Sequence, residues 1–312
     1  MANVAAGTVW NLPNYIGEIF TASRLETPLL NIMGGLNGLM QTDNFQFAVE
    51  QNYSHETAAQ PAITETASLT APTAISYVRS QVTNVCQIFQ EQVSVSYERL
   101  AGQGRLSGIN TQNSSNPVQD EIDFQTGVAL EKIARDMEYT ILQGVYQAAT
   151  ASNVANKSRG LIAAAGQTNA AAGATLSKLL IDAILKDLYD NGARYANPVM
   201  IMNSFNKQQL SNVYGYAPTD RTIGGVNIQA IETDFGLVGT ILDPFQPAGT
   251  VTVVTDVARL SVVTQPVPNK GNLFLEPLAK TGAGEELQLF GKMGVDHGPA
   301  ANIGTITGLA TS

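Results

Sequence analysis

A long helical pattern with no interior proline is the feature that most constrains the fold of this chain. It runs from Asn116, a suitable N-cap, through Pro117 at the first helical position to about Ala149. Apolar residues recur along it at helical spacing: Ile122, Leu130, Ile133, Met137, Ile141 and Val145. At 1.5 Å per residue the pattern predicts a rod of roughly 45 to 50 Å. Because such a rod extends beyond a small globular core, we expect several sheets or subunits to attach to it.

The charged residues of this segment are consistent with a single helix. Glu131–Arg135 and Lys132–Asp136 are spaced as i,i+4 ion pairs. The positive end of the helix dipole favours the carboxylates near its start, an interpretation we prefer to a catalytic acid and base: Asp120, Glu121 and Asp123. A coiled coil is the alternative, but the heptad seam that it requires is not kept.

Two stretches of alternating apolar and polar residues precede the helix and flank a polar segment. The first covers residues 45–50 and the second begins near Ile75 and continues to Tyr97. Between them, from about Ser54 to Pro72, the sequence is rich in Ala and Thr and has almost nothing large to bury. A hairpin without a core of its own is marginal in water, so we expect this one to rest on another surface. A floppy surface loop is the alternative interpretation.

Residues 1–40 show no sustained periodicity and contain several turn formers, which predicts an extended arm. The segment is too apolar for a solvated tail, so we expect it to lie on its own domain or on a neighbour. Trp10, the single tryptophan, is the best anchor candidate, and Phe20 is a second. Packing of Trp10 in its own core is equally compatible with the sequence.

After Arg159-Gly160 the pattern becomes mixed α/β. The spacing of apolar residues predicts one further helix stopped at Asn191-Gly192 and a short helix over 204–213. Strands are expected at residues 198–202, 226–231, 237–242 and 250–255, followed by a pair, 273–275 with 287–290, across a turn at 281–284. No internal repeat is visible.

Composition narrows the function classes. Charged residues are 14% of the chain against about 25% in an average soluble domain, and the net charge is −9. This balance argues against a nucleic-acid reader, whose affinity depends on cations that neutralise phosphates. A surface so poor in charge favours contact with other subunits. Neither a secretory signal nor a membrane span is expected.

The sequence contains few of the residues from which catalytic sites are usually built. The only cysteine, Cys86, lies in an apolar strand pattern and is interpreted as a buried structural thiol. The two histidines, His55 and His297, are far apart and belong to no metal-binding motif. The glycine-rich stretches lack the residues that cradle a phosphate and are interpreted as turns. We expect no catalytic residue, metal or cofactor.

The order of these parts resembles the major capsid proteins of tailed bacteriophages, whose common fold is named after phage Hong Kong ninety-seven. No single motif is diagnostic, and the order of several carries the resemblance over nearly the whole chain: Asn84–Phe89, Leu130–Glu138, Leu185–Gly192, Glu232–Gly236 and Leu278–Gly282. The resemblance implies an α+β capsid fold with an N-terminal arm, an extended β-hairpin loop, a long spine helix in a peripheral domain, and a mixed α/β axial domain.

The same resemblance implies a division of the chain. The expected parts are the arm (1–40), the hairpin loop with its adjoining strand (41–100), the peripheral domain with the spine helix (101–160), the axial domain (161–269) and a closing β segment of the peripheral domain (270–312). Residues expected to contact other subunits are Trp10, Phe20, His55, Glu56, Glu65, Arg79, Glu131 and Arg135.

The function implied is that of a structural protein, not an enzyme. Many identical copies would form hexamers and pentamers of an icosahedral virion shell around double-stranded DNA, assembled in the host bacterial cytoplasm. Portal and scaffolding proteins are expected partners, a cement protein is a further candidate, and the DNA would not be bound sequence-specifically. Residues 1–40 are too few for a fused scaffolding domain, so a separate scaffold is expected.

One departure from the founding phage concerns covalent joining of subunits. That phage links a hairpin lysine to an asparagine, whereas the first lysine here is Lys132. The hairpin therefore has no amine nucleophile, and we expect noncovalent contacts instead. Three alternatives stay open: an encapsulin-like compartment shell, an enzyme of unknown type, and a β-rich adhesin or tail-tube subunit, in which the long helix has no obvious place.

Overall fold

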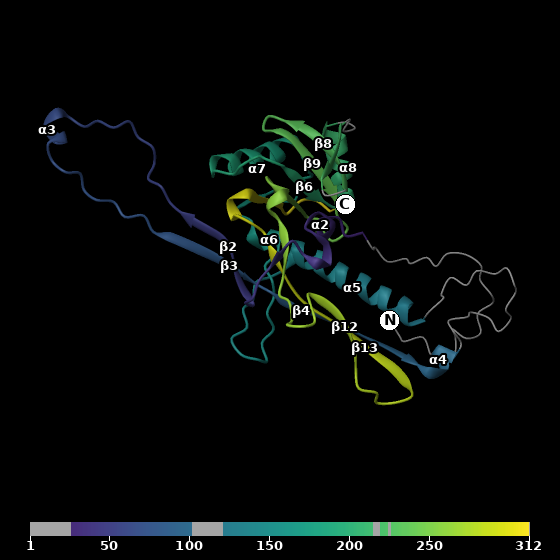
Figure 1. The fold of residues 1–312 in the computed structure, drawn as a ribbon. Helices are drawn as coiled ribbons and strands as arrows, with labels where there is room; N and C mark the ends of the chain where they lie inside the picture. Colours follow the sequence, from purple (N-terminus) through teal and green to yellow (C-terminus); the bar gives the residue numbers. More distant parts are fainter. Residues whose placement is uncertain (1–25, 102–120, 215–218, 224–225, 312) are drawn as a thin grey trace.

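Two sheets, one long helix and a projecting hairpin make up the described part of the molecule (Figure 1). The computed structural model describes residues 26–101, 121–214, 219–223 and 226–311. The short helices are α2 (Pro28–Ile32), α3 (Glu65–Ser68), α4 (Tyr97–Ala101), α6 (Leu161–Ala164), η1 (Gly35–Asn37), η2 (Val257–Arg259) and η3 (Ala300–Asn302). The longer ones are α5 (Glu121–Gln143), α7 (Lys178–Asp190) and α8 (Ser204–Tyr214).

The five-stranded sheet is organised around one long strand, β13 (Gly284–Asp296), which pairs antiparallel with three others. These are β4 (Gln87–Ser96), β11 (Ser261–Thr264) and β12 (Leu273–Pro277), and β1 (Met40–Gln41) lies parallel to β11. The predicted pair across the turn at 281–284 is confirmed, with Phe274 opposite Phe290. This sheet supports α5, which packs on β4 and β13.

The seven-stranded sheet has the order β5-β14-β10-β6-β9-β8-β7. Its strands are β5 (Gln167–Ala170), β6 (Val199–Met202), β7 (Thr219–Ile223), β8 (Val226–Thr233), β9 (Gly236–Leu242), β10 (Thr250–Val254) and β14 (Ile303–Thr307). All four residues of β6 are buried, as an apolar run in a central strand requires. Helix α7 covers β5 and β14, where Ile184 and Leu188 lie close above Gly304.

Sheet membership departs from the predicted division of the chain at two strands. β11 lies within the segment expected to be axial (161–269) but belongs to the five-stranded sheet. β14 lies within the segment expected to close the peripheral domain (270–312) but pairs with β10 and β5 of the seven-stranded sheet. Strand partners depend on long-range register, which no local pattern encodes. The rest of the division stays a prediction.

Helix α5 confirms the long helix, although its predicted end is wrong. It ends at Gln143 instead of about Ala149, and its 23 residues span roughly 35 Å. The next residue, Gly144, packs against the backbone of residues 158–160, and Gln147 then pairs with Lys157. The chain therefore turns back where a side chain at position 144 would collide. The predicted start at Asn116 lies outside the described residues.

Helix α2 corrects part of the predicted arm. Leu29, Leu30 and Met33 are fully or almost fully buried and belong to the same core cluster as Ile133, Met137 and Ile141 of α5. This part of residues 1–40 is therefore a structural element of its own subunit, one of the two placements that the apolar composition allowed. Leu39 and Met40 are exposed.

Candidate intersubunit surface

The hairpin formed by β2 (Gln46–Tyr53) and β3 (Arg79–Val85) extends away from the body, with α3 at its far end (Figure 1). Cα partners run from Gln46 opposite Val85 to Tyr53 opposite Arg79, with a bulge between Ala48 and Glu50. The predicted hairpin is thus confirmed, although residues 75–78 lie in the distal loop instead of in the second strand. Every residue from Gln51 to Gln81 is exposed.

The distal loop presents large apolar side chains to solvent. Ile63 is 72% exposed, Leu69 86% and Val78 80%, and Ile75 is also exposed. Nothing in the described chain covers them. Several large apolar side chains exposed on one projecting segment favour a surface that another molecule covers, so the hairpin is the candidate contact element of the subunit.

Three rings join the two arms of the loop where the strand ladder ends. The His55 ring lies 5.4 Å from the ring of Tyr53 and 5.0 Å from that of Tyr77, measured between centroids. Arg79, the first residue of β3, is paired through its backbone with Tyr53. Of the predicted hairpin residues, the structure therefore gathers His55 and Arg79 near the last rung of the ladder. Glu56 and Glu65 are exposed farther along the loop.

The root of the hairpin is fixed by a buried amide that sequence reasoning missed. Asn84 is fully buried, and its Nδ2 donates to the carbonyls of Val295 (2.7 Å) and Arg159 (3.0 Å). Its Oδ1 accepts the backbone N–H groups of Arg159 (2.8 Å) and Val85 (2.9 Å). On the other strand, Glu50 Oε2 accepts the N–H of Ala300 at 3.1 Å. The exposed loop therefore starts from a rigid base.

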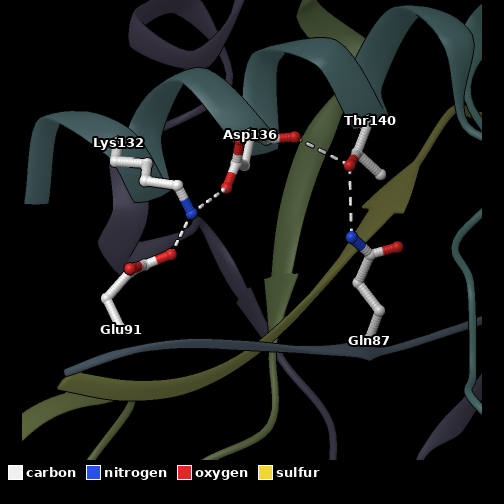
Figure 2. Close-up of polar contacts among 5 residues, drawn as sticks. All are labelled: Gln87, Glu91, Lys132, Asp136 and Thr140. Carbon is white, nitrogen blue, oxygen red and sulfur yellow. Dashed lines mark hydrogen bonds and ion pairs between the residues drawn. The ribbon is translucent and has the colours of Figure 1, made fainter. Parts of the chain in front are cut away.

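A groove of about 380 Å³ lies between α5 and β4. Figure 2 shows its polar contacts: Lys132 binds Glu91 and also Asp136, at 3.4 Å. Farther along, the Thr140 hydroxyl donates to the Asp136 carbonyl at 2.8 Å and accepts from Gln87 Nε2 at 3.1 Å. The hydrogen bond to Glu91 is the main reason why the pKa of Lys132 is raised. These contacts fasten the helix to the sheet along one wall of the groove.

The groove also has apolar lining that faces solvent. Ile88 of β4 and Tyr139 of α5 line it, and both side chains are at least half exposed. An open groove with a cation, two carboxylates and exposed apolar groups has the mixed character of a protein-binding surface.

Of the two ion pairs predicted within α5, the structure contains one. The ion pair Lys132–Asp136 is confirmed, whereas Glu131 and Arg135 are not joined by any ion pair recorded for the described chain. Glu131 is exposed, and Arg135 Nε is buried without a hydrogen-bond partner. Trp10 and Phe20 lie outside the described residues. Contact of all eight predicted residues with other subunits stays a prediction.

Burial explains why the pKa values of two side chains in the body, Cys86 and His297, are shifted. Cys86 is buried, as predicted, and burial raises the pKa of its thiol to about 12. His297 is also buried, and loss of solvation lowers its pKa. In the described ranges, no three His, Cys, Asp or Glu side chains are grouped as metal ligands would be. No helix in the same ranges has the length and hydropathy to cross a membrane.

Comparison with solved structures identifies the fold. The capsid subunit of cyanophage A-1(L) matches with a TM-score of 0.67 at 12% identity, over 99% of both chains. The capsid subunit of a native GTA particle matches with a TM-score of 0.57 at 15% identity, also over 99% of both. The SrpI encapsulin of Synechococcus elongatus PCC 7942 has a TM-score of 0.56 at 13% identity, covering 100% of this chain and 97% of that one. The fold is the Hong Kong ninety-seven-type capsid fold.

Fold alone does not separate a phage shell protein from an encapsulin, because both have it. No curated protein sequence matches the chain. A sequence model of one family, the SU10 major capsid protein, matches residues 2–310. The chain therefore belongs to the SU10 major capsid protein family and is a subunit of a phage capsid shell.

Proposed function

We propose that copies of this chain form hexamers and pentamers of an icosahedral shell in which the hairpin of each subunit lies over an adjacent subunit. The observation that carries the proposal is the hairpin itself, which is exposed from Gln51 to Gln81 and bears Ile63, Leu69 and Val78 uncovered. In a closed shell every copy covers the hairpin of a neighbour, so each of these side chains loses contact with water.

The contacts are noncovalent and individually moderate. The hairpin carries no lysine, so an amide cross-link through a hairpin amine cannot form. Many moderate contacts per shell give a stable particle, whereas very strong single contacts would trap misassembled forms. Particles boiled in SDS should run as the 33.0 kDa chain. A ladder of higher oligomers would contradict this part of the proposal.

The shell encloses double-stranded DNA without reading its sequence, and its subunit acts as a structural protein and not as an enzyme. The net charge of −9 supports enclosure without tight binding, because a negatively charged subunit does not hold the genome electrostatically as a basic inner wall would. Portal and scaffolding proteins are the proposed partners, with a cement protein as an additional one, and assembly takes place in the host bacterial cytoplasm. Co-purification of these proteins with particles from infected cells tests the set.

The decisive experiment removes the distal loop. Deletion of Ser54–Pro72 leaves β2, β3 and the Asn84 anchor in place, so the subunit should stay soluble and folded by circular dichroism. Negative-stain microscopy should then show no closed shells. A second variant replaces Ser54–Pro72 with Gly and Ser at equal length, which keeps the length of the loop but removes Ile63 and Leu69. Normal particles from either variant would contradict the role of the hairpin.

A compartment shell of the encapsulin type is the second candidate, because the SrpI structure shares the fold over the whole chain. The two functions differ in what the particle encloses. Nuclease-protected DNA inside purified particles supports the phage shell, and a co-purifying cargo enzyme without DNA supports the compartment.

A further inference from the structure

A buried carboxyl group joins the long helix to the N-terminal segment. Glu138 of α5 is fully buried, and each of its oxygens accepts a backbone N–H at the start of α2. Leu29 N donates to Oε1 at 2.8 Å and Leu30 N donates to Oε2 at 2.7 Å. The residue before the helix, Thr27, makes no capping hydrogen bond with its own side chain. Glu138 therefore satisfies from a distance the N–H groups that a local cap would satisfy.

A second buried carboxyl group lies against the first. Asp243, in the loop after β9, is also fully buried, and its Oδ1 accepts the N–H of Phe245 at 2.8 Å. Its Oδ2 is buried and has no N–H or O–H donor among the described groups. The two side chains are within hydrogen-bonding reach of each other. The Gln143 side chain of α5 also donates to the carbonyl of Phe245, at 2.7 Å, which holds the same loop on the helix.

Neither Glu138 nor Asp243 forms an ion pair with a cation of the described residues. Helix α2 carries no charged residue, and the charge that contributes to raising the pKa of Glu138 is that of Asp243. Two neighbouring carboxyl groups that are both fully buried cannot both be ionised at modest cost. Burial first, and then the hydrogen bond and charge of Asp243, raise the pKa of Glu138 to about 9, and burial also raises the pKa of Asp243.

We propose that Glu138 and Asp243 share one proton, donated by Glu138 to Asp243 Oδ2, and that this acid pair is a pH-sensitive latch that holds α2 on the long helix. The shared proton supplies the donor that the buried Oδ2 lacks. It leaves Glu138 able to accept both N–H bonds, because a protonated carboxyl group keeps acceptor capacity on both oxygens. The shared proton thus lies where α2, α5 and the loop after β9 come together, although these segments are far apart in the sequence.

The sign of the pH dependence follows from linkage. When α2 detaches, Glu138 meets water and its pKa returns toward 4.5, whereas in the latched form it is about 9. The latch is thus most stable below pH 4.5, the pKa of Glu138 in the detached form. Its stability falls as pH rises from there to about 9, the pKa in the latched form, and stays constant at higher pH. One proton released on opening increases the opening constant up to about tenfold per pH unit.

Hydrogen exchange of the Leu29 and Leu30 amides, in the full-length subunit, tests the latch. After correction for intrinsic exchange rates, protection of these two amides should fall up to about 100-fold between about pH 6 and about pH 8. Amides of β6 (Val199–Met202) are the internal reference and should lose far less. The matched variant is Glu138→Gln, which keeps a donor toward Asp243 and one acceptor toward α2 but has no proton to release.

In Glu138→Gln, protection of α2 should be independent of pH over the same range. The inference is overturned by flat protection in the unmodified protein, or by an equal slope in the variant. Should Glu138→Gln fail to fold, infrared spectroscopy of the unmodified protein at neutral pH decides the matter. A band of a protonated carboxylic acid that shifts in Asp243→Asn supports the shared proton, and its absence at neutral pH refutes it.

Discussion

The Asn84 side chain donates a hydrogen bond of 2.7 Å to the carbonyl of Val295, which ties the root of the hairpin to the central strand of the five-stranded sheet. Asn84→Ala would remove this bond and leave several buried backbone groups without partners. We expect a loss of about 2 to 4 kcal/mol in the free energy of unfolding, measured by urea denaturation of the subunit. Gln51→Ala, on the exposed part of the same hairpin, is the control and should change stability by less than about 0.5 kcal/mol. Equal effects would contradict the anchoring role.

The ion pair between Lys132 and Glu91 joins α5 to β4 at the protein surface. The Lys132 side chain is about half exposed, so Lys132→Ala should cost less than about 1 kcal/mol of unfolding free energy. The cost should shrink from about 0.01 M to about 1 M salt, because the screening length falls from about 30 Å to about 3 Å. Chemical denaturation with urea at the two salt concentrations measures it. A loss that is large and independent of salt would show that Lys132 acts through packing.

Two glycines, Gly127 inside α5 and Gly144 directly after its last residue, should respond oppositely to alanine. A Cβ at Gly127 would meet no atom within 4 Å, whereas one at Gly144 would lie 2.5 Å from the Thr140 carbonyl oxygen and also collide with Ser158. Gly127→Ala should therefore stabilise the subunit by about 0.5 to 1 kcal/mol, through helix propensity. Gly144→Ala should destabilise it. Thermal unfolding of both variants decides, and a tolerated alanine at position 144 would refute the close packing there.

The thiol of Cys86 should be inert in the folded subunit. Burial raises its pKa to about 12, so at pH 8 it is protonated as well as inaccessible. A chromogenic disulfide reagent should label no thiol in native protein and one per chain in denaturant, since the chain has a single cysteine. Fast labelling without denaturant would mean that the strand β3–β4 junction opens readily.

Local patterns predicted the elements whose character depends on near neighbours. Period-two alternation located β2 and β4, helical spacing located α5 and α7, and the apolar run at residues 199–202 located the buried β6. Gly192, with a φ of +85°, ends the turn after α7 as its sequence signal predicts. The order of these elements was enough to indicate the capsid family. The exposed hairpin followed as well, because a polar segment with few large residues has too little to bury for a core of its own.

The sequence by itself therefore determined most of the longer elements and the exposed hairpin, whereas only the tertiary structure decided which strands share a sheet and which polar groups become buried. Strand β14 and helix α2 had no distinctive local signal, since their partners lie far away in the chain. Asn84 bonds to a residue 211 positions away and Glu138 to one 109 positions away. A polar side chain is stable in the interior only when such distant partners satisfy it. Periodicity describes one segment at a time and carries no information about those partners.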